Sequence, residues 1–194
     1  MKATQQLKDE HEGIKVMLSI LEQVCQQLEV KGSLHKEHFE DILDFLKVFV
    51  GKCHHGKEET LLFPALITLG VPEEGPIATM RHEHEMGRRY VKAMSEVFDA
   101  YSAGDEFSAK DIIKNAYGYI SLLSAHIEKE NVVLFVIADS HLSNKRQHEL
   151  LEGFGKIEEE QIGMGKHEKY HRLLKKLSGI YINRSHSPDD VKGR

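Results

Sequence analysis

The chain has 194 residues, of which 40% are hydrophobic and 29% charged, and its formal net charge is −5 at pH 7. This length predicts one domain with a substantial core, and the acidic balance argues against a nucleic acid or an anionic membrane as partner. The two cysteines and the absence of a secretory leader indicate a reduced, cytoplasmic compartment. The longest apolar run, residues 132–138, is far shorter than the roughly 18 residues that cross a membrane.

The first predicted helix begins near residue 4 and ends at Gly32. Its apolar positions recur every three or four residues, which is typical of an amphipathic helix that faces a core. One histidine lies within this stripe. The stripe consists of Leu7, His11, Ile14, Leu18, Leu21, Cys25 and Leu28.

A second helix is predicted from about Lys36, and its inner face again mixes apolar residues with polar ones. The inner positions are Ile42, Leu43, Leu46, Val50, His54, Glu58 and Leu62. Pro64 should bend this helix or end its regular part. Residues 70–76 form a turn by composition, and Pro76 suits the first position of a third helix.

The third and fourth helices each carry a histidine in register with their apolar stripes. Gly104 and Asp105 close the third helix, and Ser108 with Asp111 resembles a capping box that opens the fourth. The third stripe is Ile77, Met80, His84, Gly87, Val91, Met94 and Phe98, and the fourth is Ala116, Tyr119, Leu123, His126, Glu130, Val133 and Ile137.

Short connections between four long helices predict an all-α fold, an antiparallel up-down-up-down four-helix bundle over residues 4–139. A helical extension is expected over residues 143–180, with a break at residues 163–165, and it belongs to the same domain, residues 1–180. The polar residues 181–194 are expected to be disordered.

The chain contains an internal repeat. Residues 54–63 and 126–135 share His, Lys, Glu, Leu and Phe at matching places, so His-x-x-x-Glu occurs as His54/Glu58 and as His126/Glu130. A Glu-His pair precedes each copy: His11 lies 43 residues before His54, and His84 lies 42 residues before His126. Each half of the chain therefore contributes the same set of two histidines and one glutamate.

A single histidine in a helix stripe is more often a hydrogen-bonded core residue than a ligand. Four imidazoles and two carboxylates in one bundle change this balance, because each unsatisfied buried polar group costs roughly 1 to 3 kcal/mol and a charge costs more. A bound pair of cations removes that cost. His and Glu four residues apart lie on one helix face and can reach the same ion.

His55 and Glu59 form an overlapping His-x-x-x-Glu, so the register must decide between neighbours. Four and eight residues before His54 the chain has Val50 and Leu46, whereas the equivalent positions before His55 are Gly51 and Lys47. The register and the repeat alignment both select His54. Six further histidines are expected to be solvated; they are His35, His38, His82, His141, His148 and His186.

The predicted site holds two metal ions. One ion is expected to bind His11 and His54, and the other His84 and His126. Glu58 and Glu130 would bridge them, since paired metals lie about 3.5 to 4 Å apart. Nitrogen and oxygen ligands without thiolate suit iron, and equally manganese or zinc.

The order of these motifs resembles the hemerythrin-like, or HHE cation-binding, family over roughly residues 7–138. The motifs are EH on the first helix, HxxxEExxLFP on the second, EH on the third and HxxxE on the fourth. The resemblance implies a non-haem di-iron centre in a four-helix bundle that reacts with O2, NO, peroxide or iron itself.

The chain departs from the oxygen-carrying hemerythrins, which have a fifth histidine as HxxxH on the third helix. The positions four residues from His84 are Met80 and Arg88. A further ligand could come from the C-terminal segment, from Glu160, His167 or His171, although a solvated helix that caps the bundle is the simpler interpretation of that segment.

Three functions remain open from the sequence. The first is a binding and sensing protein for O2 or NO, which is not an enzyme. The second is a di-iron oxidoreductase that consumes peroxide or O2, or an iron–sulfur repair protein; few residues precede the first helix, which weakens the repair hypothesis. The third is a bundle that a metal such as zinc only stabilises. The physiological ligand, the oxidation state and the oligomeric state do not follow from the sequence.

Overall fold

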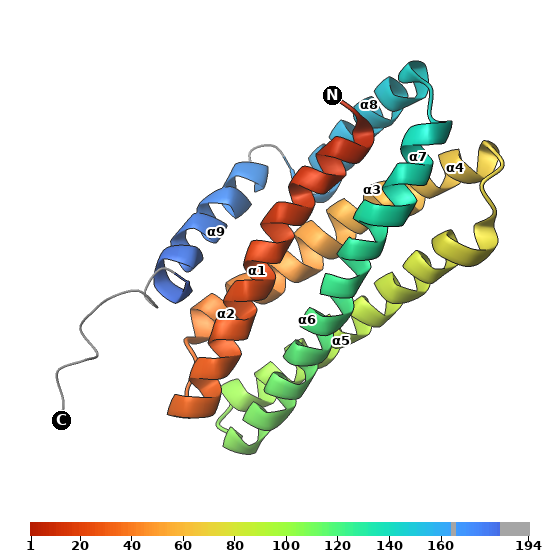
Figure 1. Cartoon of the computed structure of the whole chain (residues 1–194). Helices are drawn as coiled ribbons and strands as arrows, with labels where there is room; N and C mark the ends of the chain where they lie inside the picture. The colour runs from red at the N-terminus through yellow and green to blue at the C-terminus, as the bar shows by residue number, and fades with distance from the viewer. Residues whose placement is uncertain (164–165, 183–194) are drawn as a thin grey trace, which may run out of the picture.

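The computed structural model describes residues 1–163 and 166–182, and every secondary-structure element in this part of the chain is helical. The all-α helical bundle is therefore confirmed. The elements from α1 to α7 follow one another as four helical rods, which are described below. In Figure 1, α8 and α9 lie on the outside of this bundle. None of the helices in the described ranges is both long and apolar enough to cross a membrane.

The first rod is α1 (Ala3–Lys31), and it ends as predicted at Gly32. Gly32 has φ 67°, a left-handed conformation that glycine adopts without a steric penalty. Its N–H donates to the carbonyl of Leu28 and so satisfies one of the free carbonyls at the helix end.

The second rod is continuous but irregular. It consists of α2 (Lys36–Asp44), η1 (Phe45–His54), α3 (His55–Lys57), η2 (Glu58–Leu62) and α4 (Phe63–Thr68). The segments η1 and η2 are π-helical. Pro64 does not end the rod: it lies in the first turn of α4, where a missing N–H is tolerated.

The third and fourth rods are joined by a short loop. They consist of η3 (Glu73–Ile77) with α5 (Ala78–Ser102), then η4 (Glu106–Ser108), α6 (Ala109–Lys129), η5 (Glu130–Leu134) and α7 (Phe135–His141). The predicted turn at residues 70–76 contains Gly70 and Gly75, both with positive φ. Ser108 stands at the N-cap of α6 as predicted, but its side chain makes no capping bond to this helix. Its hydroxyl donates instead to Asp105, which caps the backbone N–H of Phe107.

The C-terminal extension is formed by α8 (Asn144–Gln161) and α9 (Lys166–Tyr181), with bounds close to those predicted. Phe154 and Tyr181 from these helices are buried. Tyr181 belonged to the segment expected to be disordered, but it ends α9; residues 183–194 lie outside the described part. His38 was expected to be solvated, yet it is 8% exposed and hydrogen-bonds the Tyr181 hydroxyl, because α9 covers it.

Two hydrophobic clusters make up the core, one toward each end of the bundle. In α1 one cluster stops at Leu7 and the other begins at Ile14, so His11 lies between them. Phe154 of α8 belongs to the first cluster and Tyr181 of α9 to the second. The layer that separates the clusters is polar and lies at the level of the predicted site.

Candidate metal centre

All six side chains that the sequence singled out meet in this polar layer. They come from α1, the second rod, α5 and the fourth rod, so each rod contributes at least one. Each is at most 1% exposed to solvent. The six residues are His11, His54, Glu58, His84, His126 and Glu130.

The four imidazoles face one another in two pairs. The Nε2 atoms of His11 and His54 lie 3.0 Å apart, and those of His84 and His126 lie 3.1 Å apart. Each pair comes from one half of the internal repeat. The structure thus groups the histidines in the pairs that the repeat predicted.

Glu58 lies between the two histidine pairs. One of its oxygens is 3.8 Å from His54 Nε2, and the other is 3.4 Å from His84 Nε2. The carboxylate therefore reaches one histidine of each pair, which is the placement expected of a bridging ligand.

Glu130 occupies the equivalent place from the fourth rod. Its Oε2 atom lies 3.2 Å from His11 Nε2 and 3.3 Å from His126 Nε2. It too reaches both pairs. The π-helical segments η2 and η5 begin at Glu58 and Glu130, so the same local irregularity accompanies both bridging positions. Such single-turn π-bulges occur frequently at functional sites.

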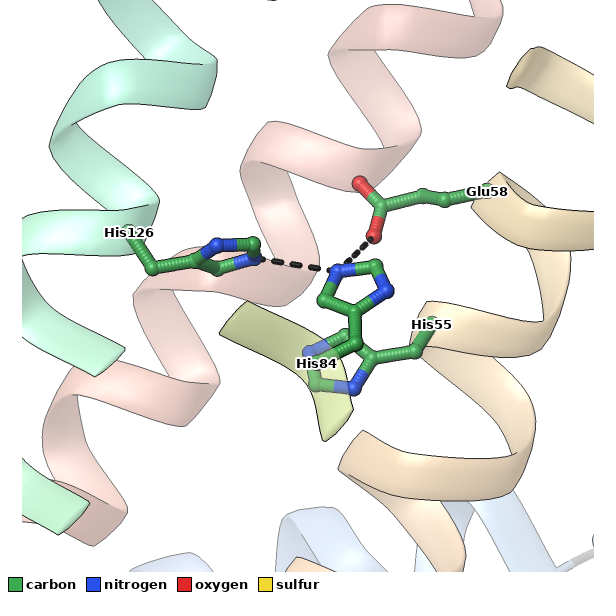
Figure 2. Close-up of side chains that lie close together, drawn as sticks. All are labelled: His55, Glu58, His84 and His126. Atoms are coloured by element: carbon green, nitrogen blue, oxygen red, sulfur yellow. Dashed lines mark hydrogen bonds and ion pairs between the residues drawn. The ribbon is translucent and has the colours of Figure 1, made fainter. Parts of the chain in front are cut away.

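His55 also faces the site, and the register argument that selected His54 alone was wrong. His55 is 3% exposed, and its ring stacks on that of His84 with the ring centroids 3.7 Å apart. The reason is η1, whose wider π-helical turn keeps two successive residues on the inner side of the rod. Figure 2 shows His55, Glu58, His84 and His126 clustered around a common space.

The outward-facing nitrogen of His54 has its own partners. His54 Nδ1 donates to Glu10 Oε2 at 2.8 Å, and Glu10 Oε1 accepts from Lys57 Nζ at 2.5 Å. Lys57 is completely buried and also donates to Glu158 of α8 at 2.5 Å. Burial opposes the charge on Lys57, but the surrounding carboxylates outweigh it and raise its pKa.

The second half of the chain repeats this arrangement. His126 Nδ1 donates to Glu83 at 3.0 Å, and Glu83 accepts from Lys129. The side chain of Lys129 is 42% exposed, in contrast to its counterpart Lys57. Sequence reasoning overlooked these Glu and Lys residues, although both were matched positions of the repeat.

The other two histidines are held in the same way by the residues that follow Glu58 and Glu130. His84 Nδ1 donates to Glu59 Oε1 at 2.7 Å, and His11 Nδ1 donates to Asn131 Oδ1 at 3.0 Å. Because carboxylate and amide oxygens only accept here, these bonds fix the ring tautomer and leave an Nε2 lone pair pointing inward.

The inward lone pairs and the buried carboxylates make the electrostatic potential of this layer negative, which favours a bound proton or cation. Burial disfavours protonated His84, but the nearby carboxylate of Glu58 and the hydrogen bond to Glu59 outweigh this effect and raise its pKa to about 9. Burial alone would raise the pKa of Glu130, yet the neighbouring His126 and His11 hold it well below its usual range.

A metal pair fits these residues. Neither oxygen of Glu58, neither oxygen of Glu130 and neither nitrogen of His55 makes a hydrogen bond within the described structure, although all are buried. Leaving such groups unsatisfied is costly. The histidines and glutamates of the polar layer form two groups, and the ligand atoms of each group lie close enough together to hold one ion. The groups are His11, His54, Glu58 and Glu130, and His55, Glu58, His84 and His126.

The C-terminal segment reaches the site through a different residue from those predicted. Neither Glu160 nor His171 belongs to the two groups, and the side chain of His167 lies outside the described part. Instead, Glu158 accepts a hydrogen bond from Lys57, which also donates to Glu10, the partner of His54.

Comparison with known proteins gives one match. The model of the hemerythrin HHE cation binding domain matches residues 2–138, which include all the residues of both groups. No curated protein and no solved structure matches the chain. The matched region covers the four rods, and α8 and α9 lie beyond it. The chain therefore belongs to the hemerythrin family of HHE cation-binding domains.

Proposed function

We propose that the chain binds two iron ions and that these ions meet a small exogenous ligand, O2 or NO. The proposal is supported above all by the unpartnered oxygens of Glu58 and Glu130, which lie between two pairs of inward-facing imidazoles. The first ion would be held by His11 and His54, and the second by His84, His126 and His55, with the two carboxylates shared.

The choice of metal follows from the donor atoms. Imidazole and carboxylate ligands suit iron, with manganese or zinc as alternatives. Cys53 adjoins His54 in sequence, but burial raises the pKa of its thiol to about 12, so it remains protonated and is a poor ligand. Cys25 is also buried and free, and the two free thiols fit the cytoplasm.

Bound iron supplies reversible one-electron chemistry and an exchangeable coordination position. The chain's own contribution is to orient the donors. Glu10, Glu59, Glu83 and Asn131 hold the four histidine rings through their Nδ1 atoms, so that every Nε2 faces the metal pair. The apolar clusters cover this layer toward the two ends of the bundle.

Metal analysis and anaerobic optical spectroscopy test the proposal. Chain isolated with iron should contain about two ions, and addition of O2 or NO to the reduced protein should produce new visible absorption. His84→Ala should lower the metal content, whereas His82→Ala, an exposed histidine on the same helix, should leave it unchanged.

Other outcomes select the alternative functions. Fully metal-loaded protein that gives no spectral change with O2 or NO would contradict the proposal and favour a stabilising metal such as zinc. Steady consumption of peroxide by the iron form would instead make the protein an oxidoreductase.

A further inference from the structure

A cleft of about 740 Å³ opens between the second rod and α5. Its exposed lining is mainly apolar, and it reaches the polar layer of the metal centre at His55, which is one of its lining residues. The apolar walls are formed by Leu43, Leu46, Val91, Phe98 and Tyr119. Two glycines, Gly51 and Gly87, also line the cleft and leave space that a side chain would fill.

His55 belongs both to the cleft and to the second group of metal-binding residues. Its ring is held by stacking on His84, and its two nitrogens have no hydrogen-bond partner among the described residues. A molecule in the cleft therefore meets His55 at the boundary of the metal centre.

The size of the cleft indicates the class of molecule. Binding sites for small organic molecules usually measure about 300 to 1,000 Å³, whereas a water molecule occupies only about 30 Å³. A diatomic gas needs far less room than this cleft offers.

The charges around the opening balance. Four basic side chains, Lys47, Lys52, Arg88 and Lys92, face four acidic ones. Arg88 is already paired with Glu59 and Glu85. With no net charge at the opening and apolar walls within, the cleft favours an uncharged molecule with an apolar body.

We propose that this cleft admits a small, uncharged, apolar organic molecule to the metal pair, with His55 at the point of entry. The proposal depends on the metal centre described above and extends its ligands beyond diatomic gases. Another, smaller cavity of about 200 Å³ borders Glu10 and Glu158, but none of the residues of the two metal-binding groups lines it.

The test measures how fast 2,2′-bipyridine, an uncharged aromatic chelator, removes iron(II) from the native full-length chain. Direct entry through the cleft predicts a rate that rises in proportion to chelator concentration. Gly87→Leu fills the cleft, since a Cβ there would lie 3.6 Å from the Tyr119 ring without a clash, and should slow removal at least tenfold. Gly51→Leu should act in the same direction.

Gly155→Leu is the matched control, because this helical glycine of α8 has nothing within 4 Å and lies away from the cleft. Its rate should equal that of the unmodified chain. Circular dichroism and metal content establish that each variant folds and is loaded. If the chain retains zinc, 1,10-phenanthroline, which is also an uncharged aromatic chelator, replaces bipyridine.

Two results would overturn the proposal: a removal rate independent of chelator concentration, which indicates local unfolding, or unchanged rates in both cleft variants. Failure of the proposed O2 or NO binding has a different signature, since it leaves the optical spectrum unchanged whatever the removal rates.

Discussion

At the scale of single residues, Lys57 has the least usual environment. Its ammonium group is completely buried between Glu10 and Glu158, whereas its repeat partner Lys129 is partly exposed. Removing one member of a buried ion pair leaves an unpaired charge and typically costs about 3 to 5 kcal/mol. An exposed pair contributes at most about 1 kcal/mol.

We therefore expect Lys57→Met to lower the free energy of unfolding by about 3 kcal/mol or more, and Lys129→Met by less than about 1 kcal/mol. Urea denaturation of the two variants measures the difference. Adding Glu10→Gln to Lys57→Met should recover part of the loss, because it removes the stranded carboxylate. Equal effects of the two lysine substitutions would show that burial of Lys57 carries no energetic weight.

A second residue-scale prediction concerns His38 and its hydrogen bond to Tyr181. Burial lowers the pKa of His38, and the nearby His35 and Lys176 lower it further, against the opposing effect of Asp41 and Glu37. The pKa of His38 is thus lower in the folded than in the unfolded protein, so the fold favours the neutral ring. The protein therefore loses stability as the pH falls below about 6.5, where His38 of the unfolded chain becomes protonated.

Docking of α9 should thus weaken on acidification. Hydrogen exchange of the α9 backbone, compared at pH 7.5 and pH 5.5 after correction for intrinsic rates, should show reduced protection at the lower pH. His38→Gln should remove most of this pH dependence. Protection that is the same at both pH values would contradict the prediction.

At the scale of elements, α5 packs against α6 at Gly118 through the ring of Tyr90. A Cβ on Gly118 would lie 2.6 Å from Cε1 of the Tyr90 ring, whereas a Cβ on Gly155 of α8 would meet nothing within 4 Å. Gly118→Ala should therefore destabilise the protein by about 1 kcal/mol or more through overpacking. Gly155→Ala should stabilise it by about 0.5 to 1 kcal/mol, because alanine favours a helix.

Thermal denaturation of the two variants checks this contrast, since both replace a helical glycine by alanine. If Gly118→Ala were as stabilising as Gly155→Ala, the tyrosine ring would have to move aside at no cost.

The sequence predicted the four rods because their stripes repeat every three to four residues over long stretches. It did not predict η1, because the residues of η1 also fit an α-helical pattern. That pattern fails only at His54 and His55, which cannot both face inward on a regular α-helix. Only packing against α5 shows that both rings point inward. The repeat was enough to predict the six inward-facing histidines and glutamates of the site. The contacts of Lys57 with Glu10 and Glu158 could not be predicted, because they depend on where α8 lies.

At the scale of the whole molecule, the polar layer divides the core into two hydrophobic clusters. Without metal, this layer contains two buried carboxylates and the unpartnered His55. A metal present at about 1,000 times its dissociation constant stabilises the folded state by about 4 kcal/mol. For a chain of this size that corresponds to a shift in Tm of roughly 10 °C.

Removal of metal with a chelator should accordingly lower Tm by roughly 10 °C, as measured by calorimetry before and after dialysis against EDTA. The shift should nearly vanish in His84→Ala and persist in His82→Ala. A Tm that does not respond to metal removal would mean that the layer is stable without cations.

The two halves of the chain build nearly the same half-site, yet they differ at two positions next to the site. His55 has no counterpart, since Ile127 occupies the matching position, and Glu59 corresponds to Asn131. In an assembly of two identical subunits each substitution would appear twice, and both groups of ligands would change together. Joining the halves in one polypeptide allows each group to have its own neighbours, so selection can change one group without altering the other.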